Sequence, residues 1–263
     1  MSRRKLRLRY PANCSSCGLA LSPKTEAVWD SETKAATCLA CAPGELDYDA
    51  GVAGASAAAE GARRKRRNVA AVRREHGDHA AAVAEAVANT SWEKGSNGEF
   101  RLAEFIQREV ADHVIPLHDR LIPGTRANID HLWITPTGVW VVDAKSYKGK
   151  VAKRDVGPFW RADYKVYVGG RDRTTLATAT EFQREAVLAA LRSDPEAKGT
   201  DIHAALCFVD SEWGLLDFPF QVGAVWVLYP GALKKRLKKD GPLSRDQMER
   251  LARRLALSLP SAA

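Results

Sequence analysis

Two acids and a lysine lie within a short span near the middle of the chain: Asp130, Asp143 and Lys145. Two β-prone runs flank a Thr-Pro-Thr-Gly turn (residues 135–138), a pattern that predicts a β-hairpin. If the proline and the second threonine form the loop, Asp130 lies directly opposite Asp143, and both project to the same face. Lys145 shares this face because side chains alternate along a strand. The two carboxylates repel each other, so the arrangement favours a bound cation.

Asp130 and Asp143 offer hard oxygen ligands of the kind that Mg2+ binds, and Mn2+ suits the same ligands. A metal held there acidifies a water molecule and neutralises the charge that develops on a phosphate under attack. Lys145 can orient or deprotonate that water, or stabilise the transition state. The three residues therefore predict a metal-dependent site for phosphodiester hydrolysis.

A third acid, Glu99, heads an apolar stripe on a predicted helix. The stripe has helical spacing and consists of Leu102, Ala103, Ile106 and Val110. An acid on this buried face is informative, and we expect Glu99 to complete the outer shell of the metal site or to position water. A capping-box spacing of Thr90 with Glu93 precedes the helix, and nearby glycines predict that its regular part begins only near Asn97.

Four of the five cysteines form two pairs, Cys14-x2-Cys17 and Cys38-x2-Cys41, near the N-terminus. Two such pairs at this separation match a zinc site of four thiolates, and we expect a short hairpin between them, as in zinc ribbons. Four thiolates leave no open coordination position, so the zinc is expected to be structural. The fifth, Cys207, lies in an apolar run and is expected to be a core residue.

The formal net charge is +8, with dense basic clusters at residues 3–9, 63–67 and 234–239. Such clusters favour a polyanionic partner, although solvated surface charge explains any single one equally well. Trp160, Tyr164 and Tyr167 lie among basic residues, which suits either base stacking or ordinary packing. No apolar run is long enough to span a bilayer and no signal peptide is visible, so we expect a cytoplasmic protein without membrane contact.

The elements that must position these residues divide the chain into three parts. Residues 1–43 form the zinc ribbon, residues 44–90 an Ala/Gly/Arg-rich linker with a helix near 78–88, and residues 91–262 the main domain. The linker is expected to be flexible around residues 51–59. In the main domain, strands are predicted at 114–117, 127–134, 139–144, 150–151, 165–168, 202–209 and 222–228. Helices are predicted at 174–191 and 233–257, the latter divided at Asp240-Gly-Pro. This order predicts an α/β (mixed α+β) fold with a central mixed sheet flanked by helices.

The order of three motifs resembles the NERD, or nuclease-related, domain of the PD-(D/E)xK nuclease-like superfamily over about residues 91–210. These motifs are Gly95-Ser-Asn-Gly-Glu99, Asn128-Ile-Asp130-His-Leu and Gly138-Val-Trp-Val-Val-Asp143-Ala-Lys145. The resemblance implies a restriction-endonuclease-like, four-stranded mixed sheet, Mg2+ ligation by Asp130 and Asp143 with help from the Ala144 carbonyl, and Lys145 as the catalytic lysine. It also points to Gln183, which stands where the family carries a glutamine. The family usually has Glu at the position of Asp143.

The sequence therefore predicts a Mg2+- or Mn2+-dependent nuclease that acts on nucleic acid, DNA rather than RNA, with the zinc ribbon and basic segments aiding binding. Two alternatives keep the nuclease fold without turnover. One is a module that only binds nucleic acid, and the other is an adaptor whose ribbon recruits a protein partner.

Overall fold

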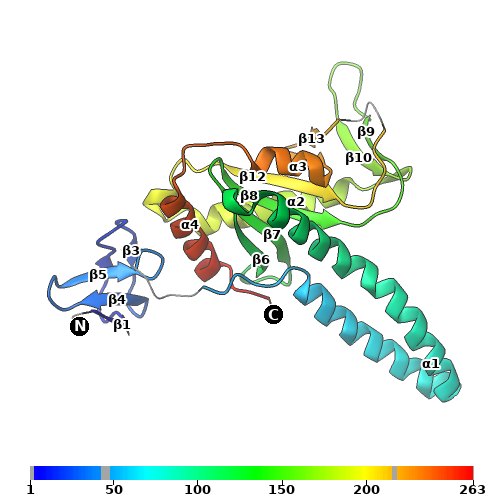
Figure 1. The fold of residues 1–263 in the computed structure, drawn as a ribbon, viewed down its shortest axis with the longest axis horizontal. Helices are drawn as coiled ribbons and strands as arrows, with labels where there is room; N and C mark the ends of the chain where they lie inside the picture. The colour runs from blue at the N-terminus through cyan, green and yellow to red at the C-terminus, as the bar shows by residue number, and fades with distance from the viewer. Residues whose placement is uncertain (1–2, 43–47, 215–217, 263) are drawn as a thin grey trace.

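The computed structural model describes residues 3–42, 48–214 and 218–262, with the backbone alone for residues 86–97. It comprises a small cysteine-rich unit, a long helical hairpin and a larger α/β unit (Figure 1). The cysteine-rich unit has a three-stranded antiparallel sheet, β1-β4-β5, and a two-stranded ladder of β2 and β3. Its strands are β1 (Arg3–Arg7), β2 (Ala12–Asn13), β3 (Ala20–Leu21), β4 (Glu26–Asp30) and β5 (Ala35–Cys38). The pairing of β4 with β5 confirms the hairpin predicted between the two cysteine pairs.

A six-stranded mixed sheet in the order β13-β14-β12-β8-β7-β6 forms the centre of the α/β unit. Its strands are β6 (Ile115–Leu121), β7 (Asn128–Thr135), β8 (Gly138–Lys145), β12 (Ile202–Phe208), β13 (Phe220–Val222) and β14 (Val225–Leu228). Strand β12 runs parallel to β8 and β14, whereas the other neighbours are antiparallel. The resemblance implied four strands, and the sheet has six because β13 and β14 extend it beyond β12. A separate small sheet contains β9 (Val151–Asp155), β10 (Tyr164–Val168) and β11 (Arg171–Asp172).

The β7–β8 hairpin has the predicted register. Ile134 lies opposite Val139 and Trp133 opposite Trp140, with the loop at the predicted Pro-Thr dipeptide. Both strands are buried along almost their whole length, because helices cover the two faces of the sheet. A slip of one residue would turn every side chain to the opposite face, so the two different cores fix this register.

Helices α2 (Thr174–Leu191) and α4 (Arg245–Ser258) pack on one face of the sheet, and α3 (Pro230–Leu237) and the end of α1 pack on the other. The bounds of α2 are those predicted, and the C-terminal helical region is divided at the predicted Asp240-Gly-Pro. Helix α4 begins after Ser244, which forms a capping box with Gln247. Two short 3-10 helices, Ala111–His113 and Pro195–Ala197, complete the set. Within the described ranges, no helix is long and apolar enough to cross a membrane.

Helix α1 (Ala55–Val110) is a hairpin of two antiparallel arms that turn at Gly77 (Figure 1). Gly77 has φ 82°, a conformation that glycine adopts without a steric penalty. Lys65 on the first arm pairs with Glu85 on the second at 3.2 Å. The second arm ends in the predicted apolar stripe, and Leu102 and Ile106 are fully buried against the sheet.

Two expectations about this segment were wrong. The chain is helical from Ala55 onward, where a flexible linker was expected, and the helix does not begin near Asn97. The Thr90–Glu93 capping box falls on side chains outside the described residues. Contacts between the arms, such as the Lys65–Glu85 pair, offset the weak local propensity of this segment.

A buried arginine joins three parts of the α/β unit. Arg120 on β6 is 1% exposed and donates hydrogen bonds to the carbonyls of Leu259 (2.7 Å), Ala256 (3.0 Å) and Asp49 (2.7 Å). Two of these carbonyls belong to the end of α4, where helical carbonyls lack partners within the helix. The guanidinium therefore ties α4 and the chain before α1 to the sheet.

Arg120→Met should destabilise the protein by about 3 kcal/mol or more, because it leaves three carbonyls without their charged donor. The free energy of unfolding from urea titration measures this effect. Arg171→Met, on the exposed strand β11, is the matched control and should change that energy by less than about 0.5 kcal/mol. Equal effects of the two substitutions would contradict the role assigned to Arg120.

Candidate active site and metal centre

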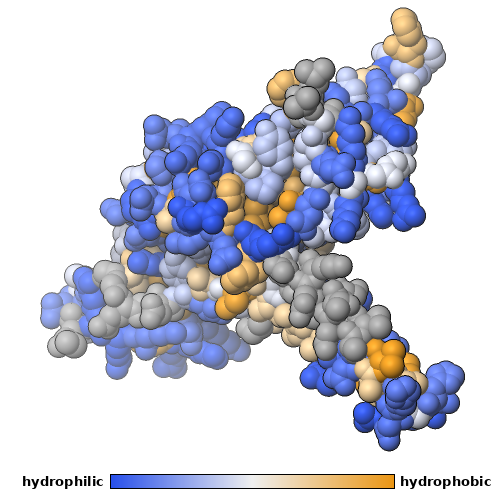
Figure 2. All heavy atoms as spheres, turned by 45° about the vertical axis from the view of Figure 1, so that its right-hand side comes forward, coloured by the Kyte–Doolittle hydropathy of each residue, from blue (hydrophilic) through white to orange (hydrophobic). Residues whose placement is uncertain are grey.

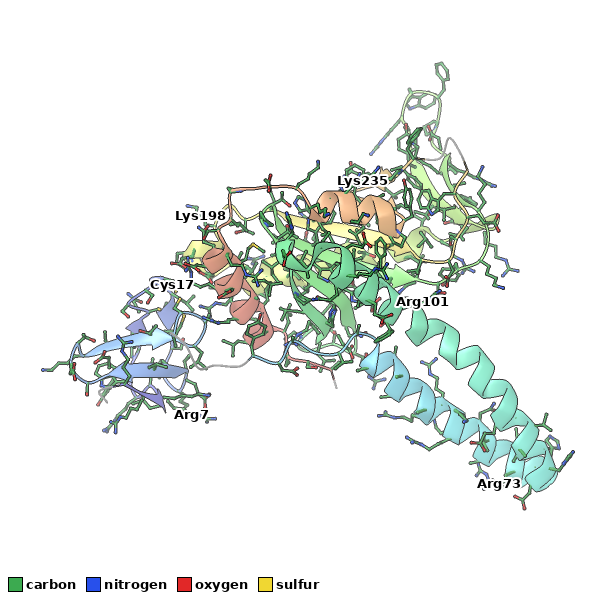
Figure 3. All side chains as sticks on the ribbon, in the orientation of Figure 1. Arg7, Cys17, Arg73, Arg101, Lys198 and Lys235 are labelled. Carbon is green, nitrogen blue, oxygen red and sulfur yellow. The ribbon has the colours of Figure 1, made fainter. Side chains whose placement is uncertain are left out.

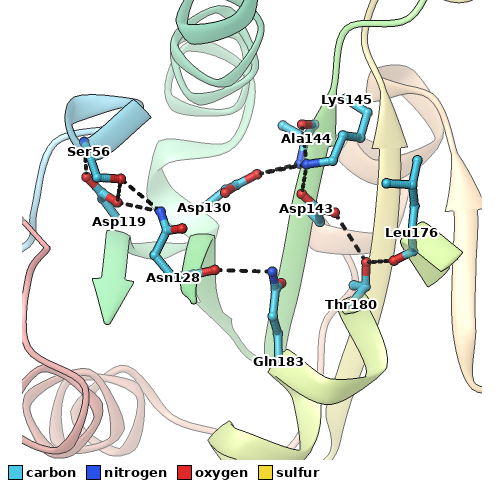
Figure 4. Close-up of polar contacts among 10 residues, drawn as sticks. All are labelled: Ser56, Asp119, Asn128, Asp130, Asp143, Ala144, Lys145, Leu176, Thr180 and Gln183. Atoms are coloured by element: carbon cyan, nitrogen blue, oxygen red, sulfur yellow. Dashed lines mark hydrogen bonds and ion pairs between the residues drawn. The ribbon is translucent and has the colours of Figure 1, made fainter. Parts of the chain in front are cut away.

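Asp130, Asp143 and Lys145, which were predicted to act together, meet at the ends of strands β7 and β8 (Figure 4). The Nζ atom of Lys145 contacts Oδ1 of Asp143 and lies 3.8 Å from Oδ2 of Asp130. The amide of Ala144 donates a 3.1 Å hydrogen bond to the same Asp130 oxygen. Both carboxylates are buried, at 7% exposure for Asp130 and 3% for Asp143. The structure thus brings two carboxylates to one cation at the strand ends.

Burial and the neighbouring charges act on these groups in opposite directions. Burial, followed by repulsion from Asp143, raises the pKa of Asp130 well above its ordinary value. Burial lowers the pKa of Lys145, but the two aspartates outweigh it and raise the pKa above its ordinary value. Lys145 is therefore protonated at neutral pH and compensates the buried carboxylates.

Helix α2 supplies two further side chains. The Thr180 hydroxyl donates to the Leu176 carbonyl at 2.9 Å and lies 3.5 Å from Oδ2 of Asp143. Gln183 donates from Nε2 to the Asn128 carbonyl at 3.2 Å. Its Oε1 atom is buried without a hydrogen-bond partner in the described part of the chain, so it is placed to accept from a water molecule. Sequence reasoning missed Thr180, although it shares a helical face with Gln183 three residues further on.

Glu99 reaches the site from α1, on the side of the sheet opposite α2. Burial, above all, raises its pKa to about 7, and the charges of Asp119 and Asp143 add to the rise against the opposing effect of Lys145. Gly98 permits this approach, because a Cβ atom there would lie 3.0 Å from the Ser146 side chain. Arg101 holds the helix in place with two hydrogen bonds to Asp210, at 2.6 and 2.7 Å.

A polar network that sequence reasoning missed adjoins the acids (Figure 4). Asp119 accepts hydrogen bonds from the backbone and hydroxyl of Ser56, and from Nδ2 of Asn128 at 2.7 Å. Asp119 has φ 51°, which an aspartate tolerates better than most residues. The network joins the first turn of α1 to the strands that carry the site, and no local pattern in the sequence connects these residues.

The oxygen donors at the strand ends fit a hard divalent cation such as Mg2+ or Mn2+, because two carboxylates already flank one positive charge. Within the described ranges, the four cysteines are the one group of three or more metal-ligating side chains whose ligand atoms lie within 4.8 Å of one another. Glu99 lies close enough to the site to interact electrostatically with Asp130, Asp143 and Lys145. Its position suits water placement in the outer shell.

The cysteine cluster has the dimensions of a tetrahedral metal site. Cys17 and Cys38 place their sulfur atoms 3.8 Å apart. Thiolates about 2.3 Å from a zinc ion at tetrahedral corners have this separation. The amide of Cys38 donates to the sulfur of Cys14 at 3.2 Å, and Gly18 adopts φ 72° in the turn after the first pair. A hydrogen bond from Cys41 is the main cause that lowers the pKa of Cys38 to about 5, and burial raises the pKa of Cys17 to about 11.

Arg254 on α4 connects this cluster to the α/β unit. It donates to the Cys38 sulfur at 3.3 Å and pairs with Asp194 at 3.0 Å. This contact places the ribbon beside that helix (Figure 1). A metal site in the ribbon is therefore coupled to the packing of the larger unit.

The other histidine, cysteine and aromatic side chains considered lie outside the group of acids. His131 projects away from Asp130, stacks on Trp133 and shares a 2.9 Å hydrogen bond with His118. Cys207 is fully buried in the core. The loop between β9 and β10 carries two exposed aromatic side chains, Phe159 and Trp160, the latter 85% exposed. Figure 2 shows hydrophobic atoms at this projecting end of the molecule. Tyr164 stacks beneath Lys153, with the amine 4.1 Å from the ring centre.

The larger unit is thus a mixed α/β domain with two buried acids and a lysine at adjacent strand ends. The family model described as the nuclease-related domain (NERD) matches residues 94–209. This part of the chain is therefore similar to a nuclease-related domain, in agreement with the resemblance noted from its motifs. No curated protein and no solved structure matches the chain.

Glu99 should give the protein a distinct pH dependence of stability. Its pKa rises from an ordinary value of 4.5 to about 7 on folding, so the folded state holds the proton more tightly. The stabilisation is complete below pH 4.5 and is lost as the pH rises through 7. Relative to Glu99→Gln, the wild type should lose stability between pH 5 and pH 7.5, as measured by urea unfolding without added magnesium. Glu104→Gln, exposed on the same helix, should keep the wild-type dependence, and a parallel curve for Glu99→Gln would contradict this effect.

The cysteine cluster should hold about one zinc ion per chain. Metal analysis of purified protein is expected to show that Cys38→Ser loses most of the zinc, because three thiolates bind it more weakly. Cys207→Ala removes a cysteine from the core and should retain the full zinc content. Retention of zinc by Cys38→Ser, or its loss from Cys207→Ala, would refute the assignment.

Proposed function

We propose that the protein is a Mg2+-dependent nuclease that hydrolyses phosphodiester bonds in DNA. The observation that carries the proposal is the meeting of Asp130, Asp143 and Lys145 at the ends of two central strands, inside a nuclease-related domain. Mn2+ suits the same oxygen ligands and is expected to substitute for Mg2+.

Asp130 and Asp143 would hold the metal, with the Ala144 carbonyl beside them. Mg2+ in this place supplies Lewis acidity to the attacking water and neutralises negative charge on the phosphate. The carboxylates are already fixed, since an amide bonds to Asp130 and the Thr180 hydroxyl lies beside Asp143. Such preorganisation lowers the cost of reaching the productive geometry.

Lys145 would bind the phosphate undergoing attack. Its raised pKa keeps the amine protonated, which suits stabilisation of negative charge rather than removal of a proton. Glu99 and the free carbonyl oxygen of Gln183 would orient the attacking water. As that water adds to phosphorus, the bond to the leaving oxygen would break. The proton of the attacking water would pass to bulk solvent, which would also supply the proton taken up by the leaving oxygen.

The zinc ribbon would add substrate affinity rather than chemistry. Strand β1 carries Arg3, Arg4, Lys5 and Arg7 at the surface of the ribbon. Because phosphate contacts by basic side chains supply most non-specific affinity for DNA, this edge suits backbone binding. A ribbon that recruits a protein partner remains the alternative for this unit.

Asp143→Asn should lower the rate of Mg2+-dependent DNA cleavage by roughly a hundredfold to a thousandfold, because it removes a metal ligand and a fixed charge at the reacting phosphate. The measurement is cleavage of labelled single-stranded, duplex and branched DNA, and of RNA, with the metal varied. Asp240→Asn, exposed in the turn before α4, is the control and should cleave at the wild-type rate.

Two results would contradict the proposal that this site cleaves nucleic acid. If wild-type protein cleaves none of these substrates with Mg2+ or Mn2+, the proposal fails and a module that only binds nucleic acid is favoured. If Asp143→Asn cleaves as fast as wild type, the activity belongs to another site or to a contaminant.

A further inference from the structure

A hollow of about 940 Å³ adjoins the acids of the site. Glu99, Asn128 and Asp130 line one side of it, and the first arm of α1 lines the other. Arg63, Arg64 and Arg67 from this arm, and Arg126 from the loop before β7, contribute to the lining. The basic cluster of residues 63–67, which is remote in sequence from the acids, therefore lies across from them.

The base of this arm is fixed to the strands. Ser56, in the first turn of α1, donates from its backbone and hydroxyl to Asp119, which Asn128 also contacts. Just before the helix, the amide of His118 donates to the Ala50 carbonyl at 2.7 Å. Gly51 has φ 71°, and a Cβ there would lie 2.1 Å from the His118 carbonyl oxygen, so only glycine fits. These contacts hold the arginines at a set distance from the acids.

The arginines are arranged around one carboxylate and remain open to solvent. Glu60 lies 2.7 Å from Arg64, 3.7 Å from Arg67 and 4.0 Å from Arg63. The side chains of Arg63, Arg64 and Arg67 are 68%, 71% and 69% exposed, respectively. One carboxylate cannot satisfy three guanidinium groups, each of which has five donors in a fork that matches phosphate. Similar networks of arginine and glutamate occur on many solvated helix faces. This network differs because it lines the same hollow as Asp130.

The dimensions of the hollow restrict what can enter it. A volume near 940 Å³ is at the upper end for pockets that hold one small molecule, which corresponds to a nucleotide or two. A duplex, whose major groove alone is about 12 Å wide, does not fit. A single strand presents phosphates that such a hollow can take in sequence.

We propose that this hollow binds an unpaired strand of nucleic acid, with Arg63, Arg64, Arg67 and Arg126 on the phosphates next to the one held at the acids. This assignment rests on the proposed nuclease function and names its substrate as a single strand or a frayed end. The arginines bind and position the strand, and they take no part in the chemistry.

The test compares two variants of equal charge on the same helical arm. Arg64→Gln with Arg67→Gln alters the hollow, whereas Arg73→Gln with Arg74→Gln alters the far end of the hairpin, where Arg73 lies (Figure 3). Affinity for a fluorescent single-stranded DNA oligonucleotide is measured by anisotropy, without magnesium, at several salt concentrations. The hollow variant should bind roughly tenfold or more weakly, and its salt slope should fall by about 1.4, at roughly 0.7 per phosphate contact. The tip variant should bind within about twofold of wild type.

Glu60→Gln tests the direction of the change in affinity for DNA. If the arginines bind phosphate, removal of the carboxylate that competes for them should leave affinity unchanged or increase it. If they only stabilise the helix, Glu60→Gln should weaken binding together with the arginine variant, and the proposal fails. Circular dichroism of each variant checks that the hairpin is intact.

Three further outcomes overturn the assignment. These are equal losses in the hollow and tip variants, no loss in either, and a wild-type preference for duplex over a single strand of equal length. Because binding is measured without turnover, the result does not depend on catalysis. A protein that binds the strand through the hollow but cleaves nothing would refute the proposed function and leave this inference in place.

Discussion

The burial of two carboxylates at neighbouring strand ends is the constraint on which the rest of the structure depends. Taking a charge out of water costs several kcal/mol per ion unless a partner compensates it. Lys145 and the amide of Ala144 supply that compensation for Asp130 and Asp143. Because the two carboxylates are held close together and repel each other, a divalent cation between them would relieve the repulsion. This placement supports the proposed metal site.

The surrounding elements make this arrangement rigid. Strands β7 and β8 are central in the sheet and buried on both faces, so the positions of their ends are set by two packed cores. Helix α2 reaches the site from one face with Thr180 and Gln183, and α1 reaches it from the other with Glu99. The candidate site thus lies at the edge of the packed core of the sheet, where small displacements are costly.

Local sequence patterns were sufficient to predict the features that form between residues close together in the chain. The turn at residues 135–138 predicted the register that opposes Trp133 to Trp140, and the helix predicted at residues 174–191 has the bounds of α2. The two cysteine pairs predicted a cluster that the fold assembles. The helical hairpin was missed because residues 51–59 have little apolar bulk, and the contact of Ser56 with Asp119 joins residues far apart in the chain. Polar contacts between residues far apart in the chain produce no periodic pattern that could be read from the sequence.

The acids at the strand ends and the arginines on the first arm of α1 have complementary roles in the proposed function. Acids that hold a metal also repel a phosphate backbone, so a nuclease must attract its substrate with groups that do not neutralise those acids. The fold separates the two by carrying the acids on the sheet and the arginines on the first arm of α1, with Glu60 between neighbouring guanidinium groups. Were Arg64 to pair with Asp130 directly, the proposed metal site would be lost. In the proposed function, the hairpin would keep positive charge near the acids without letting it pair with them.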